Sequence, residues 1–526
     1  MNNMILLLKQ LERQGVKLAL NDKGQLISQS SKEAVTPAIG ATIKAHKDEL
    51  VRCLAARAAF EAPIVAEGAR QGPLSSSQSG LWFIEQYEEA SHLYNMPVYF
   101  RVKGELDTAA LEFAFDHLFA RHPSMRTRFI KDEAGRGAQE ILPHVPFKLQ
   151  IEDVSAEPIA EREAYVARRV REEIGRPFSL TQGDLSRVHL IRLGSREHVL
   201  LITQHHIISD GWSVKNMFAD LKRAFLAHQN REPLQVSELP LTYIDYARWF
   251  NSPRFLDYHA EFKPFWVDRL GGSPEVHGLP LDKPRPAHQD SGGELVFSTI
   301  ESDLWESFKR LCQRHSTSNF IGLHALFALL MVRQSGEKEV VIGTPLAYRE
   351  RHEIESLVGF FVNTLVLRTQ LSGKPSFVDY LQQCREEDLA AFDHQLYRFE
   401  ALAEAIGADR TTAINPIFQI MLVYQAKVDF NDLIPGCQLV EETSPVLPAK
   451  TDISVKVTEL MDSVRVDWLF ATALFERETI QAYADRLLHL MRAVVAAPET
   501  DIWQLPLEAG TDQAALAAEL ADLPPD

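Results

Sequence analysis

The sequence predicts a mixed α/β protein of more than one domain, in which two halves of similar make-up share one active site. The chain has 526 residues, too many for one ordinary hydrophobic core, so two to four domains are expected. Short apolar runs rich in β-forming residues alternate with amphipathic helical patterns along most of its length. Three prolines and two glycines between positions 279 and 293 indicate a crossing between the two halves.

The net charge and the cysteines narrow the choice of partners and compartment. The formal net charge of −17 argues against nucleic acid as a partner. Four scattered cysteines, Cys53, Cys312, Cys384 and Cys437, lack the spacing of a metal site or a disulfide framework. We therefore predict a cytoplasmic protein without a bound metal. No signal peptide opens the chain and no apolar run is long enough to cross a bilayer, so a membrane partner is not expected.

Residues 1–60 predict a small α/β unit that contains a β-hairpin. After a short amphipathic helix, two alternating runs, 16–20 and 25–28, are joined by an Asn-Asp-Lys-Gly turn. Thr36 and Pro37 then start a helical stripe. Nothing in the unit obviously covers the hairpin edges, and an open strand edge accepts an extended peptide by strand addition. The residues predicted to make this docking contact are Lys17, Leu18, Ala19, Gln25, Leu26 and Ile27.

The alternative for this unit is an N-terminal decoration that packs on the main body. Residues 61–72, with Ala, Gly and Pro, are predicted to form a linker to that body.

The most informative stretch of the main body is 204–213, Gln-His-His-Ile-Ile-Ser-Asp-Gly-Trp-Ser. The apolar run 199–203 before it predicts a buried strand, and the helical stripe after it predicts a helix that Ser213 would cap. His205 and His206 would close the strand, and Asp210 and Gly211 would form the turn.

This elbow has the residues for an addition to a carbonyl group. Adjacent strand residues point to opposite faces, so only one of the two histidines can face a given cavity. An imidazole beside the free N–H groups of a helix start suits a reaction that passes through an oxyanion. Gly211 permits a close backbone approach. The alternative is a histidine that is a satisfied part of the core.

The second half repeats the mixture of strands and helices without a second His-x-x-x-Asp-Gly string. Helical patterns cover 319–334, 377–406 with an interruption near 394–400, and 476–496, and strand-like runs cover 340–343, 360–368, 420–424, 452–457 and 464–469. The two halves are therefore predicted to share one active site.

Seven stretches occur in the order found in the condensation domain of nonribosomal peptide synthetases, which residues 73–505 resemble. They are 74–82, 121–129, 205–213, 243–249, 358–368, 394–400 and 415–419. Leu396 and Arg398 stand where the family often has an acidic residue and proline, and Ser77 and Ser79 where alanine and arginine are usual. The string Leu-x-x-Gln-Gly-Val-x-Leu and the order of elements in residues 1–60 resemble the TubC-type docking domain.

The resemblance implies two lobes, each similar to chloramphenicol acetyltransferase, arranged as a V-shaped pseudo-dimer. Residues 73–250 would form the first lobe and 251–505 the second, with the active site in a tunnel at their junction. Residues 506–526 would begin a linker to a following adenylation domain.

The resemblance also implies the reaction and its partners. An upstream carrier protein would present a donor acyl or peptidyl thioester, and a downstream carrier protein an acceptor aminoacyl thioester. The acceptor amine would attack the donor thioester and form an amide. No cofactor would be bound, because the substrates travel on the phosphopantetheine of the carriers. The docking unit would capture the C-terminal tail of an upstream synthetase protein.

By the same resemblance, His206 is the critical residue, either as a general base or as an orienting group, and His205 is structural. Asp210 is expected to form a buried ion pair with Arg349 of the other lobe, because an unpaired carboxylate in an apolar setting is costly. Gly211 would keep the tunnel open. Trp212, Ser213 and Asn363 are assigned to the tunnel, with core packing as the alternative for Trp212 and Asn363.

Several relatives on the same fold remain as alternatives. A starter domain would acylate the first amino acid from acyl-coenzyme A or an acyl carrier protein, and an epimerising domain would isomerise a carrier-bound residue. A heterocyclising domain would carry Asp in place of His205 and His206. A freestanding acyltransferase and an inactive scaffold are the remaining possibilities.

Overall fold

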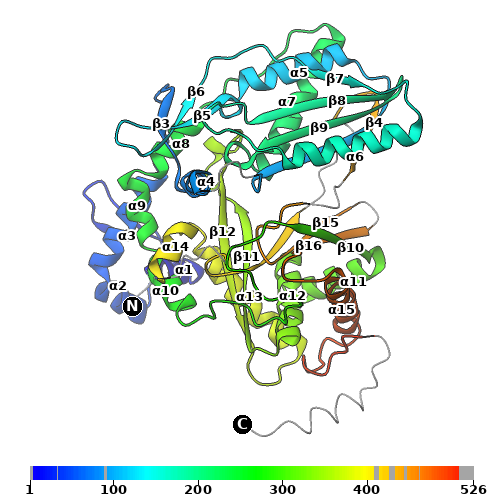
Figure 1. The fold of residues 1–526 in the computed structure, drawn as a ribbon. Helices are drawn as coiled ribbons and strands as arrows, with labels where there is room; N and C mark the ends of the chain where they lie inside the picture. Colours follow the sequence, from blue (N-terminus) through cyan, green and yellow to red (C-terminus); the bar gives the residue numbers. More distant parts are fainter. Residues whose placement is uncertain are drawn as a thin grey trace.

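The computed structural model describes residues 4–31, 34–87, 92–407, 414–425, 430, 433–442, 447–460 and 463–508. Two lobes, each built on a central β-sheet with helices packed on it, lie one above the other in Figure 1, and a small N-terminal unit lies beside them. The predicted two-lobed α/β architecture is confirmed. Most of the predicted C-terminal linker, residues 509–526, lies outside the described residues.

The N-terminal unit contains the predicted hairpin between helices. Its elements are α1 (Met4–Arg13), β1 (Leu18–Leu20), β2 (Leu26–Ser28), α2 (Pro37–Ala45) and α3 (Lys47–Glu61). β1 and β2 pair antiparallel, with Leu18 opposite Ser28. Thr36 accepts a hydrogen bond from the Ile39 N–H and so caps α2. The helical stripe after it is broken at His46, which separates α2 from α3.

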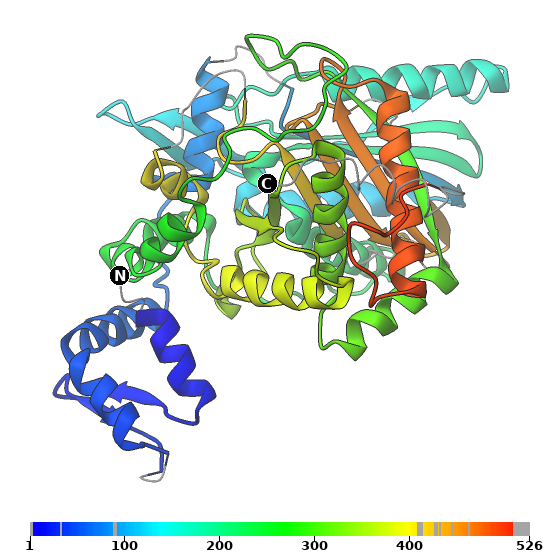
Figure 2. The same cartoon turned by 90° about the horizontal axis from the view of Figure 1, so that it is seen from below.

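The unit packs directly onto the main body, as Figure 2 shows from below. The Phe60 ring lies 5.2 Å from that of Trp249 and 4.9 Å from that of Tyr258. Arg254 donates hydrogen bonds to the carbonyl oxygens of Ala59 and Ala62. The apolar core of the unit is therefore continuous with that of the main body.

The segment between the unit and the first lobe is also held in place. Ile64 is buried, and the Glu67 N–H donates to Asp245. Gln71–Pro73 forms strand β3, which pairs with β6 (Gly137–Ile141) and, through it, with β5 (Thr127–Lys131). Residues 61–72 therefore follow the surface of the body as an ordered strap.

The first lobe is organised around a five-stranded sheet in the order β14-β4-β9-β8-β7. Its own strands are β4 (Asn95–Gly104), β7 (Gln150–Asp153), β8 (Ser186–Gly194) and β9 (Glu197–His205). Helices α5 (Thr108–Arg121) and α7 (Gly211–Asn230) pack on one face, and α6 (Ile159–Gly175) packs on the face turned toward the second lobe. α4 (Ser76–Tyr87) lies near the junction of the lobes.

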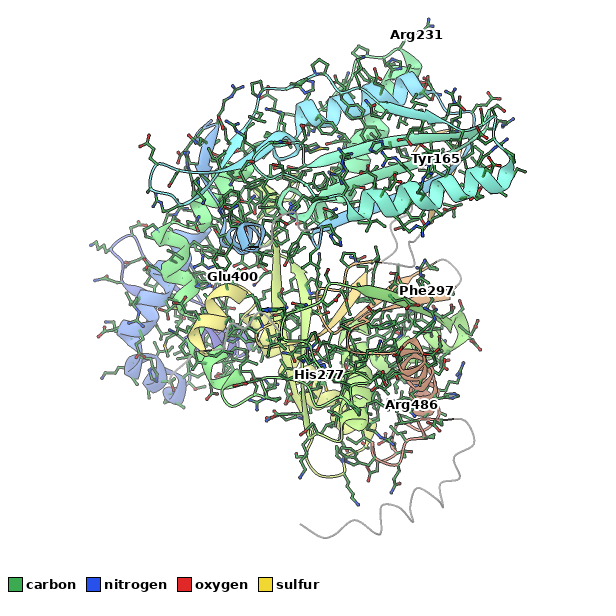
Figure 3. The ribbon with its side chains drawn as sticks, viewed as in Figure 1. Tyr165, Arg231, His277, Phe297, Glu400 and Arg486 are labelled. Atoms are coloured by element: carbon green, nitrogen blue, oxygen red, sulfur yellow. The ribbon has the colours of Figure 1, made fainter. Side chains whose placement is uncertain are left out.

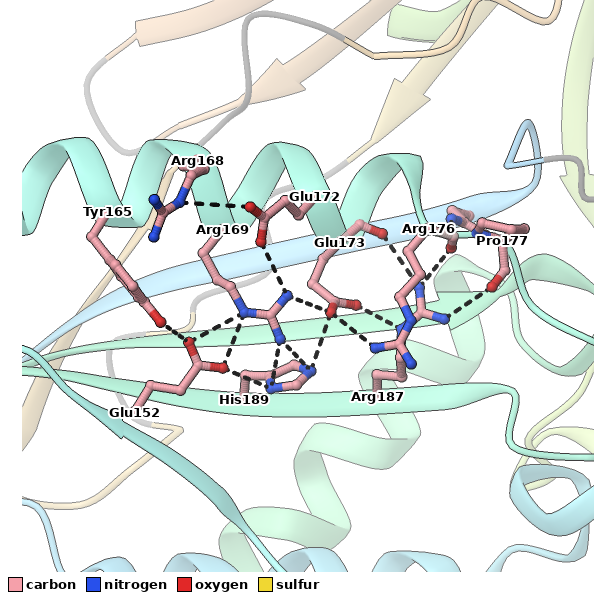
Figure 4. Close-up of polar contacts among 11 residues, drawn as sticks. Glu152, Tyr165, Arg168, Arg169, Glu172, Glu173, Arg176, Pro177, Arg187 and His189 are labelled. Atoms are coloured by element: carbon pink, nitrogen blue, oxygen red, sulfur yellow. Dashed lines mark hydrogen bonds and ion pairs between the residues drawn. The ribbon is translucent and has the colours of Figure 1, made fainter.

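A buried charge network fixes α6 on the sheet (Figure 4). Glu173 of α6 is fully buried and accepts from Arg169 and Arg187, while Arg169 also pairs with Glu152 of β7. Burial raises the pKa of Glu173, but the hydrogen bond with His189 and the two arginine charges outweigh it and hold that pKa well below its usual range. Glu173 therefore remains a carboxylate that ties α6 to β8.

The second lobe has a six-stranded sheet in the order β10-β16-β15-β13-β11-β12. Its strands are β10 (Gly293–Glu301), β11 (Glu339–Ala347), β12 (Val362–Gln370), β13 (Ile420–Gln425), β15 (Ile453–Glu459) and β16 (Ser463–Ala471). The helices are α11 (Ser302–Arg314), α12 (Asn319–Ser335), α13 (Phe377–Asp393), α14 (Phe399–Ala405) and α15 (Arg477–Ala496). The helical interruption predicted near 394–400 separates α13 from α14.

No single helix in the described part of the chain is long and apolar enough to cross a membrane. Taken together, α11 and α12 have the length and composition of a membrane span, but the pair is bent by 104°.

The polypeptide passes between the two lobes at two places. Helices α8 (Tyr243–Phe250), α9 (Pro253–Ala260) and α10 (Lys263–Leu270) lead from the first lobe. The predicted crossing, 279–293, has no helix or strand before its last residue, which begins β10. Strand β14 (Cys437–Glu442) returns from the second half and pairs antiparallel with β4, Cys437 opposite Gly104. The sheet of the first lobe is therefore completed by a strand from beyond residue 251.

Phe60 is expected to be the main apolar anchor of the N-terminal unit. Phe60→Ala should remove about 3 kcal/mol of packing between unit and body. Hydrogen exchange should then rise across α1 and α3, and a protease should cut within 61–72. Val65→Ala is the control, because Val65 is 66% exposed. Unchanged exchange in Phe60→Ala would show that the unit is held by its polar contacts instead.

Candidate active site

The elbow at 204–213 forms as a strand, a short turn and a helix. β9 ends at His205, His206–Ile208 forms a single 3₁₀ turn, and α7 begins at Gly211. The sequence predicts Ser213 as the helix cap, and this prediction is wrong. Asp210 is the cap, because its backbone is extended and its Oδ1 accepts from the Ser213 N–H at 2.7 Å. The helix therefore starts one turn earlier than predicted.

His205 has both ring nitrogens occupied by structural contacts. Its Nδ1 accepts from the Ile207 N–H at 3.1 Å, so the ring proton is on Nε2, which lies 3.3 Å from Oε1 of Glu85 on α4. The side chain is fully buried, and burial lowers the pKa of His205. This ring is an anchor between β9 and α4.

His206 is arranged in the opposite way. Its Nδ1 lies 2.8 Å from the carbonyl oxygen of Ser209, which can only accept, so Nδ1 carries the proton and Nε2 keeps a lone pair. Among the described residues, Nε2 has no hydrogen-bond partner. The Phe360 ring packs edge-to-face with the imidazole, with centroids 4.8 Å apart. His206 therefore presents one unused acceptor nitrogen.

The electrostatic surroundings keep His206 uncharged. Burial, followed by the positive charge of Lys450, lowers the pKa of His206 to about 3, although the bond to Ser209 and the charge of Asp210 oppose the shift. At neutral pH the ring is therefore a neutral hydrogen-bond acceptor. It cannot hold a proton taken from the acceptor's ammonium group, whose pKa is about 8.

Asp210 and Arg349 form an ion pair across the two lobes. Nη2 of Arg349 lies 3.1 Å from Oδ1 of Asp210, and each side chain is only 2% exposed. Oδ2 of the same carboxylate accepts from the Phe361 N–H of the second lobe at 3.0 Å. Arg349 also donates to the carbonyl oxygens of Ile354 and Leu357. The pair is thus fully hydrogen-bonded on the carboxylate side.

Ser213 strengthens the same junction through hydrogen bonds. Its hydroxyl donates to the carbonyl oxygen of Gly359 at 2.9 Å and accepts from the Gly359 N–H and from Arg349. Further contacts reach this segment from other motifs, since Ser124 donates to the carbonyl oxygen of Val358 and Ser77 to that of Val362. Three separate parts of the first lobe are therefore hydrogen-bonded to residues 358–362.

The remaining predicted site residues lie around this core. Trp212 is 40% exposed, and its indole N–H donates to the carbonyl oxygen of Glu355. Asn363 is buried and donates to the carbonyl oxygens of Gln395 and Tyr397, so it holds the turn between α13 and α14. At Gly211 an added Cβ would lie 3.6 Å from Nε2 of Gln425, an ordinary contact.

Sequence reasoning missed three contributors to the site. Glu85 lies two turns into α4, where only its position on a largely apolar helix face hinted at a buried partner. Tyr94 accepts the His206 N–H through its backbone, which no side-chain pattern reveals. Lys450 lies outside all seven of the motif stretches identified in the sequence. No group of three or more metal-ligating side chains occurs within the described ranges.

The comparisons with known proteins define the class. The family model of the condensation domain matches residues 69–516, and that of the TubC N-terminal docking domain matches residues 5–55. The chain therefore belongs to the condensation domain family and carries a docking domain at its N-terminus. The resemblance predicted from the sequence is confirmed for both parts.

The chain spans less than a tenth of the length of the first curated relatives that it matches. A linear gramicidin synthase protein of Brevibacillus parabrevis is 35% identical over 455 residues, which cover 86% of this chain and 9% of that protein. Malpinin synthetase of Mortierella alpina is 36% identical over 82% of this chain and 6% of its own length. The X-domain from teicoplanin biosynthesis is a structural relative, with 25% identity, a TM-score of 0.74, and coverage of 85% of this chain and 99% of that one.

Loss of the Asp210 carboxylate should damage the junction of the lobes more than the helix start. Asp210→Ala leaves Arg349 buried without its partner and is expected to cost roughly 3–5 kcal/mol of stability. Asp107→Ala is the matched control, because Asp107 caps α5 with its carboxylate but forms no ion pair within the described residues, and it should cost about 1 kcal/mol. The measurement is thermal and denaturant unfolding of both variants. Equal losses would rule out a special role for the ion pair.

Proposed function

We propose that this chain forms an amide bond between two carrier-bound substrates, as the condensation domain of a nonribosomal peptide synthetase. The acceptor aminoacyl group would arrive on one carrier protein and the donor acyl or peptidyl thioester on another. The observation that carries the proposal is the free Nε2 of His206, whose ring the Ser209 carbonyl oxygen orients beside the Asp210–Arg349 pair that joins the lobes.

The reaction balances with the residues present. The neutral α-amine of the acceptor adds to the donor carbonyl carbon, a C–N bond forms, and the carbonyl electron pair moves to oxygen. Collapse of this oxyanion breaks the C–S bond, and the released thiolate takes up the proton lost from nitrogen. Because the thioester is already activated, orientation of the amine supplies much of the rate.

His206 acts in this scheme as an orienting acceptor for the amine. Its low pKa, about 3, argues against a base that deprotonates a free ammonium group. The neutral Nε2 lone pair suits a hydrogen bond from the amine N–H, and this bond strengthens as the nitrogen becomes acidic during addition. Of the two roles left open by the sequence, the orienting role is the better supported.

We further assign the N-terminal unit to capture of an upstream synthetase protein. Within the described residues its sheet has two strands only, so each strand keeps an outer edge available for pairing. Ile27, one of the predicted docking residues, is 38% exposed on β2. A C-terminal peptide that adds as a third strand would bring the donor carrier near the lobes.

The broader context follows from the same family. The partners would be an upstream and a downstream carrier protein and an adenylation domain that follows this one. No cofactor is required in the chain itself, because phosphopantetheine on the carriers holds the substrates. Four free, buried cysteines fit a reducing compartment, so we assign the protein to the cytoplasm.

The alternatives have less support. The intact pair His205–His206 argues against a heterocyclising domain, and the free Nε2 of His206 against an inactive scaffold. The starter alternative is not favoured, since three linear gramicidin synthase proteins are among the sequence relatives, and the docking unit suits a donor held by an upstream protein. An epimerising domain would not be expected to follow a docking unit.

His206→Ala should abolish transfer between two loaded carrier proteins. Acyl and peptidyl groups would be loaded on the donor carrier and an aminoacyl group on the acceptor, and intact-protein mass spectrometry would follow the single-turnover transfer. We expect a loss of roughly 10²-fold to 10⁴-fold, because the amine loses its oriented acceptor. His352→Ala, which alters a histidine with an 88% exposed side chain, is the control and should transfer normally. Equal rates in wild type and His206→Ala would refute the proposal.

Gly211→Leu should impair entry of the acceptor. The alanine variant fits at ordinary contact distance from Gln425 of β13, whereas a leucine needs more room between α7 and that strand. We expect Gly211→Ala to transfer at nearly the wild-type rate and Gly211→Leu to lose roughly 10-fold to 100-fold, mainly through the acceptor KM. The measurement is the same assay with the acceptor carrier varied. A normal acceptor KM in Gly211→Leu would contradict this role for Gly211.

A further inference from the structure

Residues 447–452 connect the second lobe to the active site of the first. Leu447 packs against the apolar cluster of α6, β8 and β9 in the first lobe. The Ala449 N–H donates to the carbonyl oxygen of Ser291, and Gln289 donates to that of Lys450. The segment is thus held by both lobes, with Lys450 near its middle.

A buried anchor fixes the far end of this segment. The Asp452 carboxylate pairs with Arg285, and it accepts from Nε2 of His277, a residue labelled in Figure 3, at 2.9 Å. A Cβ placed on Gly293 would clash with the carbonyl oxygen of Leu447 and lie 2.9 Å from the Ala449 nitrogen. Because backbone atoms make these contacts, the segment has little freedom to shift.

Lys450 points its ammonium group at the residues around the two histidines. Its Nζ lies 4.8 Å from the centroid of the Tyr94 ring, a cation–π contact. The Tyr94 carbonyl oxygen accepts the His206 N–H at 2.9 Å, and the Tyr94 ring lies 6.4 Å from that of His205. Across the described residues, no carboxylate forms an ion pair with Lys450.

We propose that Lys450 supplies a positive charge beside His205 and His206 and stabilises the oxyanion formed when the acceptor amine adds to the donor thioester. The inference rests on the proposed function. The charge acts while the carbonyl electron pair resides on oxygen, between formation of the C–N bond and cleavage of the C–S bond. Before addition, the same cation disfavours protonation of the amine and of His206, so both nitrogens stay available.

The charge state of Lys450 fits this role. Burial lowers the pKa of Lys450 to about 8, so most of the side chain remains protonated at pH 7 and loses its charge above pH 8. The groups that face it are Tyr94, His205 with its partner Glu85, and His206 with Asp210 beyond it. The positive charge of Lys450 contributes to the lowered pKa of both histidines, in keeping with its place over the Tyr94 ring, which lies 6.4 Å from the ring of His205.

The test compares Lys450→Met and Lys450→Arg in the two-carrier assay, with single-turnover rates measured across pH 6–10. Lys450→Met should lose roughly 10-fold to 100-fold at saturating carriers, somewhat less than loss of a direct oxyanion donor. Lys450→Arg should retain most of the rate and keep it above pH 8, where the wild-type side chain loses its charge. Lys309→Met, which removes a charge paired with Glu306 on α11, is the matched control.

Three results would overturn the inference, and they are distinguishable. If wild type transfers and Lys450→Met matches it at every pH, the role of Lys450 fails while the proposed function stands. If wild type transfers nothing, both fail. A third measurement does not depend on activity: an NMR titration should show the pKa of His206 rising in Lys450→Met, and an unchanged His206 titration would refute the electrostatic role.

Discussion

The carboxylate of Asp210 is the point on which the two lobes depend. One group caps α7 through the Ser213 N–H, accepts the Phe361 N–H of the second lobe, and neutralises the buried Arg349. None of these partners is easily replaced by water, because both charged side chains are almost fully enclosed. His206 lies one turn before this cap, so the position of its imidazole follows the closure of the lobes. In the proposed reaction, stability and chemistry are thus coupled through one side chain.

The adjacent histidines show how hydrogen bonds give identical side chains different chemistry. His205 receives an amide N–H on Nδ1 and donates from Nε2, so no nitrogen is left over. His206 donates from Nδ1 to a carbonyl oxygen, which leaves Nε2 as an acceptor. The end of β9 produces this difference, because the chain leaves the strand between the two residues. The backbone, rather than the side-chain type, assigns the roles.

Local sequence predicted the elements well and their partners poorly. The elbow, the hairpin and the helices of the second half follow from periodicity and capping residues, although Ser213 and Asp210 are both good caps and local sequence did not separate them. The pair Asp210–Arg349 came only from resemblance, since its members are far apart in the chain. Glu85, Lys450 and the crossing strand β14 are non-local pairings that no local pattern encodes.

Arg349 and Lys450, two cations near the site, have opposite electrostatic surroundings. Arg349 faces the carboxylate of Asp210, so its charge is neutralised in the ion pair that joins the lobes. Lys450 faces the Tyr94 ring and the two histidines, of which His205 contacts Glu85, and within the described structure it forms no ion pair. A buried cation without a counter-ion is costly, and burial accordingly lowers the pKa of Lys450. The proposed reaction creates two negative charges in turn, the oxyanion of addition and the thiolate released by C–S cleavage, and a nearby cation stabilises the transition state in which the oxyanion develops.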